Sequence, residues 1–292
     1  MDPDSLLSDF IRRQTLVAFD TETTGLWAVS NSIVEIAAVK FQPGAPQIEV
    51  FQSLVNPQRL IPDEVIEIHG ITQEMVKDAP TAGSVLEEFL QFVGDDSILV
   101  AHNAPFDISF IGEELRRAKL DLPDNLILDT VDIYHRLFPG LPSYSLLNLV
   151  SQFGLATSQD HRALADAELV RRLFEMAAPK MTEIGSRDEI ESHLAVYRMT
   201  DFETQAAELP KEHSVLNDAI RHGWRVEIEY RHPTRGLDTR TIRPERSYQL
   251  GPVHYINAWC ERASAQRTFR LDRVESYSVI TENSSDSTPN QP

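Results

Sequence analysis

The chain has 292 residues, of which 41% are hydrophobic and 25% charged, and its formal net charge is −18. This length indicates two domains that can bury a core without disulfides. The single cysteine, Cys260, excludes a disulfide framework and a cysteine-based metal site, and the acidic balance argues against a protein that coats DNA regardless of sequence. No apolar run reaches the ~18 residues of a membrane span, and the start resembles no signal peptide, so we expect a cytoplasmic protein without a membrane partner.

The first half of the chain alternates strand and helix patterns in an order typical of an α/β layer fold with a mixed central sheet. Strands are expected at 16–19, 32–39, 50–55 and 97–101. Helices are expected at 84–93, 106–118, 129–137, 145–153 and 161–178. The strands at 16–19 and 97–101 are apolar on both faces, so we expect helices to cover both sides of the sheet.

The pattern changes in the last third. One helix ends at Gly223, and short alternating segments separated by turn residues then predict a small β-barrel or strongly bent sheet. The segments are 225–230, 240–243, 248–250, 253–260 and 268–274. We divide the chain into a lead-in, an α/β domain, a charged linker, a small β domain and a polar, disordered tail. Their bounds are 1–14, 15–180, 181–212, 213–280 and 281–292.

Charge is distributed unevenly between these parts. Residues 211–280 hold 12 Lys and Arg against 9 Asp and Glu, whereas the rest of the chain holds 15 against 36. Most of this acidity is expected on a solvated surface, but part of it could form a carboxylate cluster that needs a metal.

Two carboxylates end the first strand. Asp20 and Glu22 are two residues apart, so both side chains point to one face, and they repel each other unless a cation lies between them. Two exposed charges at a strand end are the alternative.

Two further carboxylates are predicted on apolar helix faces. Asp107 shares its face with Phe110 and Ile111, although a helix N-cap is an equal alternative for this residue. Asp166 likewise projects from a face of apolar residues three, four and seven positions later. An ionised carboxylate in such a place is costly without a partner.

A histidine precedes the second of these carboxylates. His161 lies five residues before Asp166, which on one helix is about 140° away. We therefore expect His161 in the loop before the helix, where a neutral imidazole can act as a general base near pH 7. A surface histidine is the alternative. Four carboxylates and a mobile histidine fit phosphodiester hydrolysis assisted by two ions, and oxygen ligands favour Mg²⁺ or Mn²⁺.

Three segments in order resemble the motifs of the DEDDh 3′–5′ exonucleases. They are 19–26 (FDTETTGL), 102–107 (HNAPFD) and 161–167 (HRALADA). The segment 68–72 (IHGIT), with Asn56-Pro57 before it, is similar to the proofreading-type branch. The resemblance covers about residues 15–178.

This resemblance implies an RNase H-like fold in which four carboxylates hold two metal ions and His161 is the general base. The metal-holding and catalytic carboxylates would be Asp20, Glu22, Asp107 and Asp166. It also implies contacts with the 3′-terminal nucleotide from the loop after the first motif and from Phe106, with His69 and Asn103 lining the same groove. The loop residues concerned are Thr23, Gly25 and Leu26.

Residues 225–274 resemble a WYL domain, a small Sm-like β-barrel of bacterial regulators. The triplet His254-Tyr255-Ile256 stands where Trp-Tyr-Leu is expected, which puts the details of ligand recognition in doubt. The resemblance implies binding of a nucleic acid or a nucleotide, since arginines contact phosphates and aromatic rings stack on bases. The candidate ligand-binding residues are Tyr230, Arg240, Arg243, Tyr255 and Arg270. The alternative places the aromatic residues, Trp259 among them, in the core.

The leading hypothesis is a metal-dependent 3′–5′ exonuclease acting on single-stranded nucleic acid, with DNA the expected strand. A nuclease of short oligoribonucleotides and a non-catalytic nucleic-acid-binding regulator on the same fold are the alternatives. Phosphate-binding, dinucleotide-binding and nucleophile-elbow motifs are absent from the sequence, which argues against an ATPase, a Rossmann dehydrogenase and an α/β-hydrolase.

Overall fold

The protein is described from a computed structural model covering residues 9–181, 184–202, 208–232, 236–250 and 253–280. It forms two compact units, residues 1–203 and 204–292, each described by itself. Part of the predicted lead-in, Asp9–Arg13, forms helix α1. The predicted tail at 281–292 lies outside the described residues.

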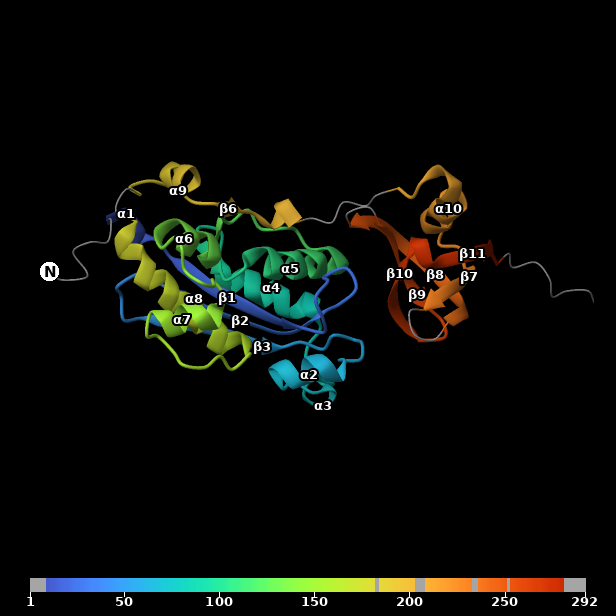
Figure 1. The fold of residues 1–292 in the computed structure, drawn as a ribbon, viewed down its shortest axis with the longest axis horizontal. Coiled ribbons are helices and arrows are strands. Elements are labelled where there is room, and N and C mark those ends of the chain that lie inside the picture. Colours follow the sequence, from blue (N-terminus) through green and yellow to red (C-terminus); the bar gives the residue numbers. More distant parts are fainter. Residues whose placement is uncertain (1–8, 182–183, 203–207, 233–235, 251–252, 281–292) are drawn as a thin grey trace, which may run out of the picture. The chain divides into compact units, whose positions relative to one another are not determined.

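The first unit is built on a six-stranded mixed sheet in the order β3-β2-β1-β4-β5-β6 (Figure 1). Strand β1 lies parallel to β4 and antiparallel to β2, and β5 lies parallel to β4. The bounds are β1 Leu16–Thr23, β2 Ile33–Phe41, β3 Ile48–Leu54, β4 Ile98–Ala101, β5 Ile127–Asp129 and β6 Val196–Tyr197. The predicted mixed sheet is therefore confirmed.

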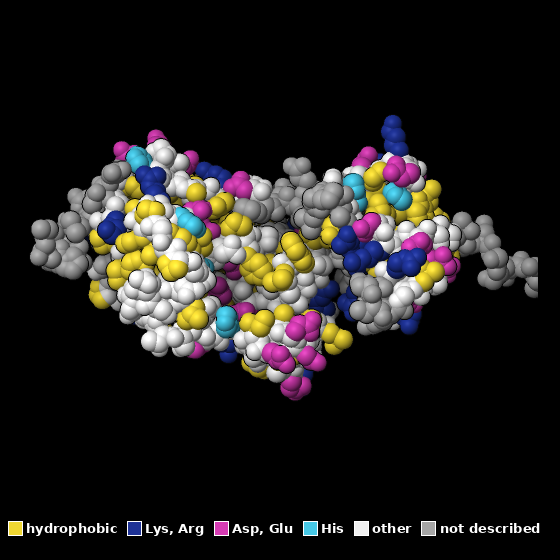
Figure 2. Space-filling view, viewed as in Figure 1, with side chains coloured by type: hydrophobic (Ala, Val, Ile, Leu, Met, Phe, Trp, Pro, Cys, Tyr) yellow, Lys and Arg dark blue, Asp and Glu magenta, His cyan; other side chains and the backbone are white. Residues whose placement is uncertain are grey.

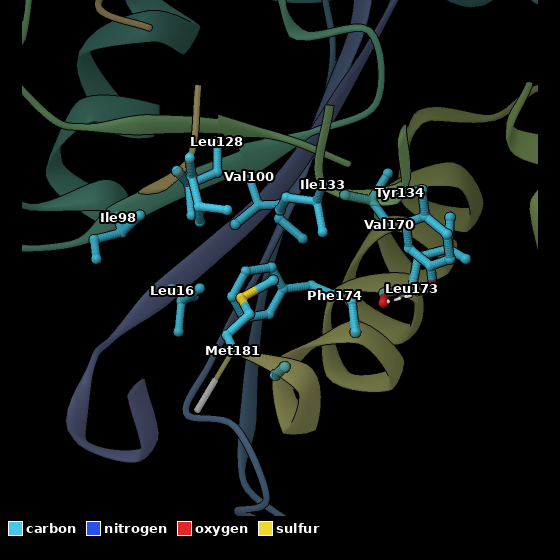
Figure 3. Close-up of a cluster of buried hydrophobic side chains, with 14 of the residues drawn as sticks. Leu16, Ile98, Val100, Leu128, Ile133, Tyr134, Val170, Leu173, Phe174 and Met181 are labelled. Atoms are coloured by element: carbon cyan, nitrogen blue, oxygen red, sulfur yellow. Dashed lines mark hydrogen bonds between the residues drawn. The ribbon is translucent and has the colours of Figure 1, made fainter. Parts of the chain in front are cut away.

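Alternation along β1 divides the core into two layers. Leu16 and Ala18 pack on one face, whereas Val17 and Phe19 pack on the other, and all four side chains are buried. Helices α4 and α5 supply residues to the Phe19 layer, and α6, α7 and α8 supply the Leu16 layer. Figure 3 shows the Leu16 layer, with Leu173 of α8 beside Tyr134 of α6. Burying both faces is what the continuous apolar runs of the central strands require.

The helices of this unit are short apart from three. Their bounds are α2 Asp63–His69, α3 Gln73–Val76, α4 Ala82–Val93, α5 Ala104–Ala118, α6 Thr130–Leu137, α7 Leu146–Gln152, α8 Ala163–Ala177, α9 Arg187–His193, and the 3₁₀ helices η2 Ala178–Lys180 and η3 Met199–Phe202. Among the described residues, no helix combines the length and apolar character needed to cross a membrane.

One buried carboxylate joins both layers. Asp129, at the end of β5, accepts hydrogen bonds from the backbone N–H groups of Asn103 and Ala104 at the start of α5, at 2.9 and 3.0 Å. It also accepts one from the N–H of Val131 in the first turn of α6, at 2.8 Å. These donors have no partner within their own helices, so a single side chain caps two helices that cover opposite faces of the sheet.

The segment predicted as a linker differs from expectation in its first part. Strand β6 pairs with β5 in the main sheet, and Met199 of η3 is buried in the layer of α4 and α5. The first unit accordingly extends to Glu203. The two-residue strand is too short to leave a periodic pattern in the sequence. The prediction of a linker therefore rested on the charged residues of this segment.

The second unit is one helix on a five-stranded antiparallel sheet in the order β10-β9-β8-β7-β11. Its bounds are η4 Lys211–His213, α10 Ser214–His222, β7 Val226–His232, β8 Gly236–Leu250, β9 Val253–Cys260, β10 Ala265–Arg270, η5 Leu271–Arg273 and β11 Val274–Val279. Gly223 ends α10 in the left-handed conformation, as predicted.

The expected Sm-like closed barrel is not what the described strands form. They make an open antiparallel sheet with β10 and β11 at its edges. Two segments predicted separately, 240–243 and 248–250, belong to the single long strand β8, whose pairing with β9 shifts at a bulge between Pro244 and Arg246. A bulge bends a strand without ending it, so bending takes the place of the predicted strand break.

Candidate active site

Three carboxylates from two elements come together beside the end of β1. Asp20 and Glu22 lie on β1, and Asp166 lies in the first turn of α8. One oxygen atom from each of the three lies within 4.8 Å of the others, which is close enough to share one cation. The structure thus brings together three of the four carboxylates that the sequence patterns pointed to.

Asp166 is buried and only partly satisfied. Its Oδ2 accepts a hydrogen bond from the side chain of Gln159, at 2.7 Å. Its Oδ1 is buried and has no hydrogen-bond donor among the described residues. A buried carboxylate oxygen without a donor is costly in a folded protein, so this atom needs a further partner such as a cation.

Asp107 lies slightly apart from this group of three. It is buried on α5, as Phe110 and Ile111 are, and Asn103 rather than Asp107 is the N-cap of that helix. Asp107 Oδ1 accepts hydrogen bonds from the N–H and the hydroxyl of Thr21, at 2.9 and 2.6 Å. The carboxylate is therefore held against β1 from the side opposite α8.

Burial and neighbouring charges raise the proton affinities of these carboxylates. Burial, followed by the charges of Asp107, Asp166 and Glu22, raises the pKa of Asp20 well above its usual range. Burial and the charge of Asp166 raise the pKa of Glu22 to about 8. Burial also raises the pKa of Asp107 to about 7, against the hydrogen bonds from Thr21. A divalent cation would stabilise the charged forms of these groups.

The chemistry of this donor set fits a hard divalent cation. Oxygen ligands are those that Mg²⁺ and Mn²⁺ prefer, and the orphaned Asp166 Oδ1 is available for coordination. Asp20, Glu22 and Asp166 are the residues that could hold such an ion, with Asp107 adjoining them.

His161 lies in the loop before α8, as the spacing predicted. Helix α8 begins only at Ala163, and the His161 backbone has a φ of +49°, which turns the chain sharply just before the helix. The side chain is exposed. Burial raises the pKa of the neighbouring Asp166, and the hydrogen bond from Gln159 and the nearby His161 oppose this shift only in part. An exposed imidazole beside the carboxylates can exchange protons with solvent.

The loop that follows β1 is held by hydrogen bonds from α5, although two of its side chains are exposed. Leu26 and Trp27 are 74% and 62% exposed. The guanidinium of Arg117, on α5, donates to the backbone carbonyls of Ala28, Val29 and Asn31 at 2.7–3.0 Å. Apolar side chains on such a braced loop can meet a nucleobase without first paying for ordering of the chain.

Thr23 and Gly25 shape the start of this loop. Thr23 is buried, and its hydroxyl donates to the Gly25 carbonyl at 2.7 Å. A Cβ at Gly25 would lie 2.7 Å from the side-chain oxygen of Asn31, so a larger residue would force the loop apart.

The other predicted substrate residues lie on α2 and α5. His69, at the end of α2, is buried; its Nδ1 accepts from the N–H of Ile71 at 2.9 Å, and its Nε2 is buried without a hydrogen-bond partner among the described residues. Asn103 is exposed in the left-handed conformation that begins α5. Phe106 is half-buried, with its ring 5.0 Å from that of Phe110.

A fifth carboxylate beside this site was not identified from the sequence motifs. Glu35, on β2, is fully buried and forms an ion pair with Arg162, which lies between His161 and α8. The two residues are 127 positions apart, so only the fold brings them together. A lone charge within the apolar run 33–39 was the one available hint.

In the second unit, most of the predicted ligand-binding residues contact other side chains of the same unit. Tyr230 packs edge-on against Phe269, and Tyr255 stacks on Tyr248, with ring centroids 5.2 Å apart in both pairs. Arg240 pairs with Asp238 and Arg270 with Asp272. Arg243 is exposed and lies opposite Trp259, itself 41% exposed, on the β8–β9 pair.

The chain matches two protein families along its length. The RNase_T family model, described as an exonuclease, matches residues 17–174, and the WYL domain model matches residues 212–279. Since the first match covers more than half of the chain, the protein belongs to the exonuclease family and is a nuclease by class. Both resemblances inferred from the motifs are confirmed, as is the α/β RNase H-like fold.

Similar proteins of known kind include DNA polymerases. The chain is 38% identical over 188 residues to the PolC-type DNA polymerase III of Oceanobacillus iheyensis, covering 62% of this chain and 13% of that protein. It is 37% identical over 175 residues to the Bacillus subtilis protein of the same name, covering 58% and 12%. The chain thus matches about an eighth of the length of these relatives.

A solved structure of a 3′-exonuclease that recognises the 3′ end of a histone mRNA stem-loop shares the fold. The identity is 18% and the TM-score 0.53, over 61% of this chain and 67% of that one. This likeness concerns the fold alone.

Proposed function

We propose that the chain is a metal-dependent 3′–5′ exonuclease that hydrolyses single-stranded nucleic acid, with DNA the preferred strand, and that its WYL domain binds the strand or a nucleotide. One observation carries the proposal: the oxygens of Asp20, Glu22 and Asp166 lie within 4.8 Å of one another, and Asp166 Oδ1 is buried without a donor. Burial and then the charges of the neighbouring carboxylates raise the pKa values of Asp20 and Glu22, so the cluster does not stabilise the fold without a cation.

Asp20, Glu22, Asp107 and Asp166 would hold two Mg²⁺ or Mn²⁺ ions. When bound, such ions lower the pKa of the attacking water and stabilise charge on the phosphate and the leaving oxygen. His161 would accept the proton of that water as its oxygen attacks the terminal phosphorus. The bond from phosphorus to the 3′ oxygen then breaks, which releases a nucleoside 5′-monophosphate and leaves a new 3′ hydroxyl on the strand.

The loop after β1 supports a single-stranded substrate. Leu26 and Trp27 offer exposed apolar surface a few residues beyond the carboxylates, and unpaired bases can stack on such side chains. Thr23, Gly25, His69, Asn103 and Phe106 would complete the contacts with the terminal nucleotide. The similarity to PolC-type DNA polymerases supports DNA over RNA.

The second unit would supply the long-range attraction that the acidic first unit lacks. Residues 211–280 carry more Lys and Arg than Asp and Glu, and Figure 2 shows basic side chains gathered over the strands of this unit. Arg243 and Trp259 together offer a cation and an aromatic ring on one exposed surface. Tyr230, Arg240, Tyr255 and Arg270 would contribute after their internal contacts rearrange.

The test is a time course with 5′-labelled single-stranded DNA and RNA of one sequence. Loss of one nucleotide at a time, dependent on Mg²⁺ or Mn²⁺ and stopped by EDTA, is the expected result, with DNA cleaved faster. A strand blocked at its 3′ end should persist. Faster cleavage of RNA would favour the oligoribonuclease alternative, and binding without cleavage would favour the regulator.

A matched pair of variants distinguishes cleavage at this site from cleavage by a contaminating nuclease. Asp166→Asn should be inactive, whereas Glu168→Gln, two residues along α8 and paired with Arg171, should cleave as the parent does. Equal activity in both variants would contradict the proposal.

A further inference from the structure

We infer that Glu35 and Arg162 form a positioning pair for the proposed active site, in which a buried carboxylate on β2 fixes the His161 loop and the first turn of α8. This inference rests on the proposed function. Neither residue is among the proposed metal-holding carboxylates or the candidate substrate contacts. The pair connects β2 with the start of α8.

The contacts around Glu35 are complete. Arg162 donates two hydrogen bonds to it, from Nε to Oε2 at 3.0 Å and from Nη2 to Oε1 at 2.6 Å. Gln52 of β3 donates to Oε1 at 2.9 Å, and the backbone N–H of Ala163 donates to Oε2 at 3.0 Å. A two-pronged pair of this kind fixes orientation as well as distance.

These contacts fix the start of α8. Ala163 is the first residue of the helix, so its N–H lacks a partner within the helix and Glu35 supplies one. The carbonyl of Arg162 accepts the N–H of Asp166 at 3.0 Å. Arg162 is therefore held by its side chain on one end and joined to the first turn on the other, with His161 directly before it.

The location of Glu35 links this anchor to the metal-holding strand. Glu35 lies directly opposite Glu22 in the antiparallel pairing of β1 with β2. Its charge adds to the repulsion that raises the pKa of Asp20 and Glu22, whereas the charge of Arg162 acts in the opposite sense on Glu22. The guanidinium thus lets a carboxylate stand beside the cluster as an anchor without adding a net negative charge.

An ion pair that served only the stability of the fold would not need to lie beside the carboxylate cluster. A buried pair is weak evidence for stability, because desolvation opposes the attraction between its charges. What the pair does provide is a fixed distance between Glu22 on one side and His161 and Asp166 on the other. We therefore expect its loss to lower turnover rather than substrate affinity.

Arg162→Met is the primary variant, because the Arg162 side chain is 38% exposed and its loss need not prevent folding. We expect kcat to fall about 10–10²-fold, the usual cost of a small misplacement of catalytic groups, with KM changed less than about threefold. Arg162→Lys should recover part of the loss. Arg171→Met, which removes another ion-paired arginine of α8, should leave kcat unchanged.

A double variant tests whether the two residues act as a unit. Glu35→Gln combined with Arg162→Met should cost no more in kcat than the worse single variant, because the second change removes a partner already lost. Multiplied losses would show that the residues act separately and would overturn the inference. Unchanged kcat in Arg162→Met, with an active parent, would overturn it as well.

A measurement without substrate separates this inference from the proposed function. The ring signal of His161 in proton NMR spectra, assigned by its loss in His161→Gln, should shift or broaden in Arg162→Met and stay unchanged in Arg171→Met. An unchanged His161 signal in Arg162→Met would overturn the positioning role even if the parent proved inactive. An inactive parent with a shifted His161 signal would contradict only the proposed function.

Discussion

The first unit gathers Asp20, Glu22 and Asp166 within 4.8 Å of one another, whereas the second unit sets Asp238, Glu261 and Asp272 each against an arginine. The consequences for proton affinity are opposite. Burial and like charges raise the pKa of Glu22 to about 8, but the hydrogen-bonded guanidinium of Arg270 lowers the pKa of Asp272.

The two units therefore differ in how their carboxylates are neutralised. Those of the second unit are paired with arginines, whereas those of the first unit repel one another. Paired charges at a surface gain little from a further ligand. Buried carboxylates that repel one another can lower their free energy substantially when a cation arrives. The chemistry is therefore expected in the first unit, and binding in the second unit should depend on residues outside its ion pairs, Arg243 and Trp259 foremost.

The largest effect is expected when the cluster loses a carboxylate. Asp20→Ala should lower the rate of hydrolysis on the order of 10³-fold or more, since charge stabilisation by the bound ions is worth several kcal/mol. Release of mononucleotides from labelled single-stranded DNA measures it. The metal-free variant should melt no lower than the parent, because the change relieves repulsion. Turnover within tenfold of the parent would refute the metal-site assignment.

A smaller loss of activity is expected when the proposed general base, His161, is removed. His161→Ala should reduce the rate by roughly 10²–10⁴-fold, the usual contribution of a general base. Binding of a noncleavable strand, followed by fluorescence anisotropy, should change little, because the imidazole is exposed and outside the carboxylate cluster. Full activity of the variant between pH 6 and 8 would show that another group accepts the proton.

The stability of the metal-free protein should fall as the pH rises. In the folded protein, burial raises the pKa of Asp107 to about 7 and, with neighbouring charges, that of Glu22 to about 8, whereas unfolded carboxyls titrate near pH 4. The folded state then binds more protons, so its advantage is complete below about pH 4 and is lost as the pH rises towards 8.

Thermal melts in EDTA between pH 5 and 8 measure this dependence. Each kcal/mol lost should lower Tm by about 2–4 °C for a domain of this size. Mg²⁺ should restore Tm most at pH 8, and Asp20→Asn should flatten the dependence. A metal-free Tm that rises from pH 5 to 8, with no response to Mg²⁺, would contradict the contrast between the two units.

The smallest effect is expected in the second unit. Arg243→Ala should raise KM for a long strand a few-fold at low salt, leave cleavage of very short strands unchanged, and reduce the salt slope of binding by about one. Arg231→Ala, which removes an arginine paired with Glu275, is the matched control and should have a weaker effect. Equal behaviour of both variants would favour a sensor or protein-docking role for this unit.

Long periodic segments of the fold were predictable from the sequence. Residues 16–19 and 97–101 are apolar on both faces, which predicts a buried central strand. The apolar residues of α4, α5 and α8 recur at helical spacing. The three-residue β5, the two-residue β6 and the short helix α3 are too short for any period to show. They form because neighbouring strands pair with β5 and β6 and because Val76 of α3 packs in a small apolar cluster, which are tertiary effects.

The candidate site was predictable where a single segment places a charged residue in apolar surroundings, such as a carboxylate on an apolar helix face. It was not predictable where the relevant partner is distant in sequence. Thr21 has no periodic or motif signal of its own, yet its N–H and hydroxyl donate to Asp107 on α5. The same applies to Glu35, whose partner Arg162 lies 127 positions away in the sequence.

The cap that Asp129 provides to both α5 and α6 bears on how the first unit unfolds. Because one carboxylate satisfies amides on helices from both faces of the sheet, neither helix start can fray without disturbing the other. The two layers should therefore open as one cooperative unit. In hydrogen exchange, the amides of Asn103, Ala104 and Val131 should share a single opening free energy, and Asp129→Ala should split it into two.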